Sequence, residues 1–243
     1  ARSDFSRQAF WNLMGASDSL AQPHVFLMQP YDPKRKIIIM LHGIASSPEA
    51  WVNTANEVLG DETLRENYQL WQLYYPTNLP LVLNLQTIRN SILQTLRHFD
   101  PQGLAPASQD MVIIGHSMGG VLARLLVSDS GESILHAMVG QRELDEQRQL
   151  RFFNRFRDDL TFTALPGVTR AVFIAAPHRG TAVANYRLAR WLASLITLPV
   201  AVLERFTQAA ELLTDPDAAE TTRPVRFTSI DNLSDKDPFI VAS

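Results

Sequence analysis

The sequence predicts an α/β domain in which a mostly parallel central sheet carries helices on both faces. Short apolar runs alternate along the chain with segments whose apolar residues recur at a helical period. The run KIIIML at 36–41 is continuously apolar, as expected of a strand buried on both faces of a parallel sheet. The 243 residues, 46% of them hydrophobic, suffice for one large domain with a packed core.

Five strands are expected, each a short apolar run that ends at glycine, proline or a His-Gly pair. They lie at 24–30, 36–41, 69–75, 111–115 and 170–176. Helices are expected where apolar residues recur at a helical period. They lie at about 48–66, 80–99 and 118–128, with one or two more surface helices within the polar range 129–166. Residues 100–109 are expected to form a loop.

Two further segments flank this pattern. Residues 1–23 are expected to form an N-terminal helical arm that packs on the domain, and residues 24–243 to form the core. Within the core, the range of about 182–220 is expected to be a helical, lid-like insertion. Its apolar residues either cover a pocket or form the core faces of helices that pack on the sheet. They are Trp191, Leu192, Leu195, Ile196 and Phe206.

Composition excludes several classes of site. A net charge of −3 offers no basic surface for nucleic acid, and the absence of cysteine excludes disulfides, a cysteine nucleophile and thiolate metal ligands. No His or carboxylate spacing suits a metal, and no phosphate-binding or dinucleotide-binding glycine pattern is present. We therefore expect no cofactor and no metal. No apolar run approaches the roughly 18 residues that span a bilayer.

The run GHSMGG at 115–120 carries the strongest functional signal. A strand-like run precedes it and a helix-forming segment follows it, which is the context of a nucleophile elbow. Gly115 and Gly119 are expected where any Cβ would collide with the neighbouring strand or helix. The turn would raise the Ser117 hydroxyl above the sheet and leave the Met118 N–H at a helix N-terminus, where it stabilises an oxyanion. The alternative is an ordinary glycine-rich turn.

A second oxyanion donor is expected in the loop His42-Gly43-Ile44, which follows the strand at 36–41. The N–H of Ile44 is the geometric candidate. His42 and His116 flank the expected site, but both belong to turns, which they are expected to brace by hydrogen bonds. The order of the two segments, about 70 residues apart, is more specific than either alone.

Three segments resemble the α/β-hydrolase family of serine esterases and lipases. They are LHGIASSPEAW (41–51), IIGHSMGGVLARLL (113–126) and VFIAAPHRGT (172–181), the last similar to bacterial lipase-like hydrolases and the GPI inositol deacylase group. The resemblance covers residues 25–240 and implies an α/β-hydrolase fold. It implies Ser117 as nucleophile, the N–H groups of Ile44 and Met118 as oxyanion hole, and acyl transfer to water through an acyl-enzyme. It also suggests a cell-envelope or secreted enzyme.

The chain departs from that family in its catalytic acid and histidine. The family order is Ser, then Asp or Glu, then His. Only His136 and His178 follow Ser117, and neither takes the place of a final-loop histidine. Asp231 follows an apolar run, but a segment like PVRFTSIDNLSDKDPF precedes the seventh strand in similar proteins.

The acid and histidine are therefore expected outside these 243 residues, and the sheet is expected to be incomplete at its C-terminal end. The chain is a truncated or cleaved piece, or a second polypeptide supplies the rest, or the natural protein has lost the triad. The first two are favoured because GHSMGG and LHG are intact. The start at Ala1, without a leader, indicates a processed chain or a piece of a longer one.

The predicted function is a serine hydrolase of carboxylic esters, lipid-like or otherwise apolar, active only if the missing acid and histidine are supplied. Two rivals stay open: an acyltransferase that uses the same serine, and a non-catalytic binding module that keeps the pocket. The expected partners are a small-molecule or lipid-like ester and a C-terminal fragment, with membrane contact open. Tyr74 and Tyr75 close the strand at 69–75 and either reach the site or pack at the sheet edge.

Overall fold

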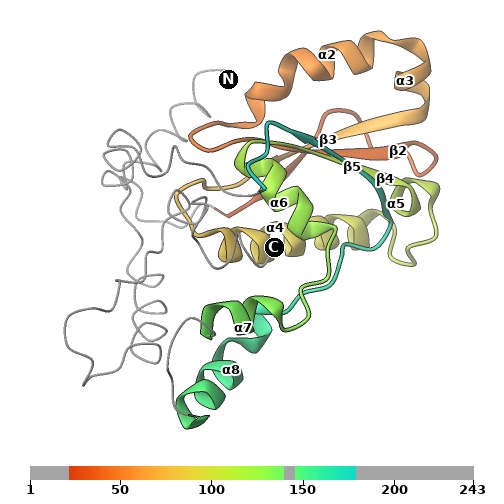
Figure 1. The fold of residues 1–243 in the computed structure, drawn as a ribbon. Coiled ribbons are helices and arrows are strands. Elements are labelled where there is room, and N and C mark those ends of the chain that lie inside the picture. Colours follow the sequence, from red (N-terminus) through yellow and green to blue (C-terminus); the bar gives the residue numbers. More distant parts are fainter. Residues whose placement is uncertain (1–21, 140–145, 179–243) are drawn as a thin grey trace.

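The computed structural model describes residues 22–139 and 146–178 (Figure 1). The expected N-terminal arm, apart from residues 22 and 23, lies outside the described residues. So do the insertion expected at about 182–220 and the chain from there to residue 243, including Asp231.

The described chain forms a five-stranded sheet in the order β1-β3-β2-β4-β5. β1 runs antiparallel to β3, and the other neighbours are parallel. The strands are β1 (His24–Leu27), β2 (Lys36–Leu41), β3 (Tyr68–Tyr74), β4 (Met111–His116) and β5 (Val168–Ile174). The predicted mostly parallel sheet is thereby confirmed.

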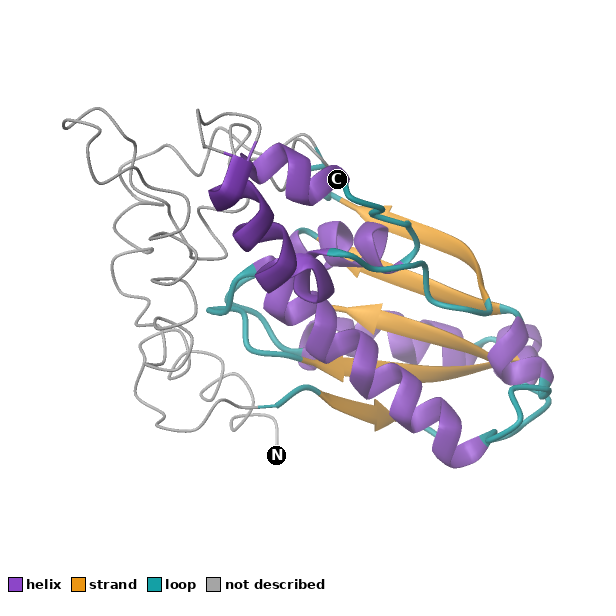
Figure 2. Cartoon of the chain, turned by 90° about the horizontal axis from the view of Figure 1, so that it is seen from below, coloured by secondary structure: helices purple, strands orange, loops and turns teal. Residues whose placement is uncertain are grey.

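Helices cover both faces of the sheet (Figures 1 and 2). One face carries η1 (Pro48–Trp51), α2 (Val52–Gly60) and α3 (Glu62–Asn67). The other carries α4 (Leu81–Phe99) and α6 (Met118–Leu126). Farther from the sheet lie α7 (Ser133–Val139) and α8 (Glu146–Leu160), and α8 contacts α4 (Figure 1). The single-turn α5 (Pro106–Gln109) contacts β2.

Strand β2 lies at the centre of the core. Its side chains alternate between the two faces, because successive residues of a strand point in opposite directions. Ile37, Ile39 and Leu41 pack in the cluster that includes α4 and α6, whereas Ile38 and Met40 pack with Trp51 and Ala55. The burial on both faces that the run at 36–41 predicts is confirmed.

Three expectations need correction. The helix expected at about 48–66 is broken at Asp61, whose backbone is extended and whose carboxylate accepts the Leu64 N–H at 2.8 Å. Such an N-cap begins a new helix. The loop expected at 100–109 contains α5. The strand expected at 170–176 is β5, which is not buried: Val172, Phe173 and Ile174 are about two-fifths exposed, because β5 is the edge strand of the described sheet.

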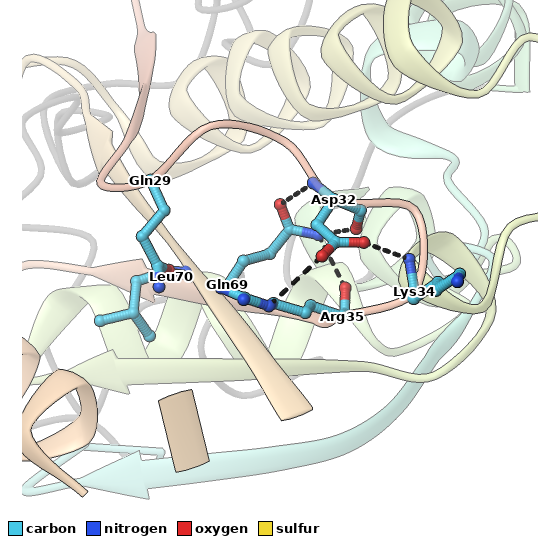
Figure 3. A network of polar contacts seen from close by, with 6 residues as sticks. All are labelled: Gln29, Asp32, Lys34, Arg35, Gln69 and Leu70. Atoms are coloured by element: carbon cyan, nitrogen blue, oxygen red, sulfur yellow. Dashed lines mark hydrogen bonds and ion pairs between the residues drawn. The ribbon is translucent and has the colours of Figure 1, made fainter. Parts of the chain in front are cut away.

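A buried amide holds the connection between β1 and β2 onto β3 (Figure 3). The Gln69 Nε2 donates to the carbonyl oxygens of Asp32 at 2.6 Å and Arg35 at 2.7 Å, while its Oε1 accepts the Asp32 N–H at 3.2 Å. The Leu70 N–H donates to Gln29 Oε1. This network supports the start of β2 and β3, whereas Ser117 follows the opposite end of the parallel strands.

Candidate functional site

Ser117 alone forms the turn between β4 and α6. Its φ of 54° and ψ of −123° are a strained combination for a residue other than glycine. Its N–H donates to the Ile174 carbonyl of β5 at 2.9 Å, and its own carbonyl accepts the Gly120 N–H at 2.9 Å. The strand, sharp turn and helix predicted around this serine are confirmed.

Glycine is required where α6 starts against the end of β2. A Cβ on Gly115 would lie 2.2 Å from the Gly119 carbonyl oxygen, and a Cβ on Gly119 would lie 2.4 Å from the carbonyl oxygens of Leu41 and His42. Real Cβ atoms do not approach backbone this closely, so the predicted collisions at both glycines are confirmed. These contacts bring the start of α6 to the loop that follows β2.

That loop lies directly beside Ser117. A Cβ on Gly43 would lie 3.2 Å from the Ser117 Cβ and 3.2 Å from the Nδ1 of His116. The N–H groups of Ile44 and Met118 have no acceptor within residues 22–139 and 146–178. In a nucleophile elbow, a serine beside two such donors from separate segments forms an acyl-enzyme, and the donors stabilise its oxyanion.

The fold is that of an α/β-hydrolase. Its mostly parallel sheet, its strained serine after β4 and its loop after β2 occupy the relative positions that this fold requires. The same strand order places β2 at the centre of the described sheet with β4 beside it, and the parallel pairing brings the ends of β2 and β4 together.

His42 is a buried, neutral part of the turn. Its Nδ1 donates to the Gly43 carbonyl at 3.0 Å, and its ring stacks on that of Tyr75 with centroids 4.3 Å apart. Burial lowers the pKa of His42 to about 4, although the hydrogen bond to Gly43 opposes this shift. The imidazole of His116, by contrast, is exposed.

Acid should destabilise the protein through His42. The unfolded histidine binds a proton near pH 6.5, whereas the folded one does so only near pH 4, so the free energy of unfolding falls as the pH drops between these values. The loss amounts to about 3 kcal/mol. Urea unfolding of the wild type and of His42→Gln at pH 7 and pH 4 measures it.

Comparing the wild type with His42→Gln separates the contribution of His42 to the pH dependence from that of His178, whose pKa is also lowered by burial. We expect the wild type to lose more stability than His42→Gln over this range. Equal losses in both proteins would show that His42 does not control this part of the pH dependence.

All six histidines are described, and none is hydrogen-bonded to the Ser117 hydroxyl. Both ring nitrogens of His178 are shielded from solvent and lack a hydrogen-bond partner among the described residues, and its ring lies edge-on to Phe173. The Nε2 of His136, on α7, lies 3.6 Å from the Oε2 of Glu132, which directly precedes that helix. Among the described residues, therefore, no histidine is hydrogen-bonded to the serine hydroxyl.

The sequence analysis missed one polar residue next to the site. Thr77, in the connection between β3 and α4, accepts the N–H of Ala45 on its Oγ1 at 3.1 Å. The sequence left open whether Tyr75 reaches the site or packs at the sheet edge. In the structure Tyr75 is fully buried, and its ring stacks on that of His42. The sequence signal that points to Thr77 is the polar pair Thr77-Asn78, which directly follows Pro76 at the end of a strand.

Within the described ranges, no group of three or more His or carboxylate side chains could hold a metal ion. No helix in those ranges is long and apolar enough to cross a membrane.

No family model and no curated protein matches the chain. Solved structures do. Mature lipase BlEst2 from Bacillus licheniformis is 15% identical with a TM-score of 0.44, and the match covers 90% of this chain and 63% of the lipase. A carboxylesterase from Nitrososphaera gargenis is 12% identical with a TM-score of 0.38, over 92% and 68% of the two chains. Esterase B from Lactobacillus rhamnosis is 15% identical with a TM-score of 0.38, over 84% and 65%.

The chain thus spans less than two thirds of the length of BlEst2. The fold is assigned by the strand order and the turn at Ser117, and these likenesses assign no roles to individual residues.

Proposed function

We propose that this chain is the nucleophile-bearing part of a serine hydrolase that cleaves carboxylic esters through an acyl-enzyme on Ser117. The observation that carries the proposal is the contact between Gly43 and Ser117, which sets the loop after β2 beside a strained serine. An ordinary glycine-rich turn requires neither the strain at Ser117 nor a second loop with an unpaired N–H.

In this reaction the Ser117 hydroxyl oxygen attacks the acyl carbon and its proton passes to a general base. The C–O bond to the alcohol then breaks, and the alcohol leaves with that proton. Water attacks the acyl-enzyme, releases the carboxylic acid and restores the serine. The N–H groups of Ile44 and Met118 would stabilise the negative charge on the carbonyl oxygen, each contributing about 3 kcal/mol to lowering the barrier.

The proposal takes the base and its acid from outside these 243 residues, either from a longer form of the chain or from a second polypeptide. Its support is that no histidine of the chain is hydrogen-bonded to Ser117 in the structure. The proposed substrate is an apolar or lipid-like ester, and the proposed location is the cell envelope or the exterior. Both follow from the resemblance of residues 172–181 to bacterial lipase-like hydrolases and the GPI inositol deacylase group.

An alkyl fluorophosphonate probe tests the nucleophile. The 243-residue chain of 27.3 kDa and the full product of the natural gene are each weighed intact before and after exposure to the probe. We expect one adduct on the full product, mapped by peptide mass to Ser117, and slow or no reaction of the 243-residue chain. Absence of an adduct on both proteins would overturn the proposal.

A non-catalytic binding module is the second candidate, because no histidine of the described site is hydrogen-bonded to the serine. Such a protein would bind an ester without turnover and would leave the probe unreacted in its full natural length. The labelling experiment therefore separates the two functions.

A further inference from the structure

We infer that Tyr75 and Thr77 are positioning residues, which hold the loop at 42–45 so that the Ile44 N–H points at the acyl oxygen beside Ser117. This inference rests on the proposed hydrolase function. Both residues belong to the connection between β3 and α4, in which Tyr75 is 1% and Thr77 4% exposed. A buried polar side chain in a connection needs a hydrogen-bond partner, and here each side chain has a partner in the loop after β2.

Tyr75 fixes the start of the loop. Its hydroxyl donates a hydrogen bond to the carbonyl oxygen of His42. Its ring also stacks on the His42 imidazole, with the two planes only 12° apart. The backbone and the side chain of His42 are therefore both held by one tyrosine.

Thr77 fixes the other end of the loop. Its Oγ1 accepts the N–H of Ala45 at 3.1 Å. Ala45 has a φ of 51°, a left-handed conformation that an alanine adopts at a cost in free energy. The hydrogen bond compensates part of that cost. Ile44 thus lies between two residues that are each tied to the same connection.

The connection is itself anchored to a helix. Asn84, fully buried in the first turn of α4, donates from its Nδ2 to the carbonyl oxygens of Pro76 at 3.0 Å and Leu79 at 3.1 Å. Helix α4 therefore fixes the position of this connection, and the connection in turn fixes the loop that contains Ile44. A site whose donors are fixed before the substrate arrives spends no energy on reorganisation during the reaction.

Removing either anchor should slow acylation more than it weakens binding, because the donor acts mainly in the transition state. Loss of a whole oxyanion donor costs about 10²–10³-fold in rate, so a donor that is merely loosened should cost about 10–100-fold. Tyr75→Phe keeps the stacking on His42 and removes only the hydroxyl. Thr77→Val keeps the shape and removes the acceptor, whereas Thr77→Ser restores it.

The test is the kinetics of fluorophosphonate labelling of the full natural protein, resolved into probe affinity and the first-order labelling rate. We expect Tyr75→Phe and Thr77→Val to lower that rate about 10–100-fold with probe affinity within about 2-fold, and Thr77→Ser to label like the wild type. The matched controls are Tyr68→Phe, at the opposite end of β3, and Thr87→Val, whose hydroxyl bonds within α4. Wild-type labelling rates in both anchor variants would overturn the inference.

Hydrogen exchange at the Ala45 amide gives a readout that needs no activity. Thr77→Val should speed this exchange at least about 10-fold, because it removes the acceptor of that N–H. Unchanged exchange would overturn the inference even if the labelling rate fell. If the wild type is not labelled but the exchange responds, the proposed hydrolase function fails, and with it the role in acylation.

Discussion

Replacing Ser117 with alanine should lower ester turnover by about 10⁴-fold or more while the protein stays folded. Without the hydroxyl oxygen no acyl-enzyme can form, and the N–H groups of Ile44 and Met118 are left with only the weak catalysis of a bound water. The backbone hydrogen bonds of residue 117, to Ile174 and from Gly120, are retained by alanine. The measurement is the initial rate with a p-nitrophenyl ester, made on the full natural protein alongside its thermal unfolding midpoint.

Ser128→Ala is the matched control. Ser128 lies just beyond the other end of α6, and its hydroxyl donates to the Arg124 carbonyl at 2.8 Å. We expect this variant to retain wild-type turnover. A pure sample of Ser117→Ala that turns over ester at the wild-type rate would remove Ser117 from the mechanism.

The core of the site was predictable because it depends on local sequence. The run GHSMGG defines its own turn, and the strand and helix beside it need only a β-branched run and a helix-forming segment. Gly115 and Gly119 follow from the same pattern, because a tight strand-to-helix turn leaves no space for a Cβ.

What the sequence could not predict depends on contacts between distant residues. The hydrogen bond between Thr77 and Ala45 spans 32 positions, and no periodicity points to it. The sequence likewise does not predict that Phe173 is exposed, because an apolar run looks the same in a central strand and in an edge strand. The break at Asp61 depends on one capping carboxylate inside an otherwise helical pattern.

Replacing Gly119 with alanine should destabilise the protein, against the ordinary preference of helices for alanine. Gly119 is the second residue of α6, where alanine would normally gain about 1 kcal/mol. Its Cβ would instead lie 2.4 Å from the carbonyl oxygens of Leu41 and His42. These are backbone atoms that cannot rotate away, so α6 must shift from the end of β2, at a cost of about 3 kcal/mol.

Gly60→Ala is the control, because it makes the same substitution at the last residue of α2 with nothing within 4 Å of the new Cβ. Urea unfolding should show this variant equal to or up to about 1 kcal/mol more stable than the wild type. The changes in the free energy of unfolding that the two variants cause should therefore differ in sign as well as in size. If Gly119→Ala unfolds at the same urea concentration as Gly60→Ala, α6 does not depend on close contact with the loop after β2. The same shift would move Ser117 away from Gly43. In the full natural protein, Gly119→Ala should therefore also lose fluorophosphonate labelling, whereas Gly60→Ala should keep it.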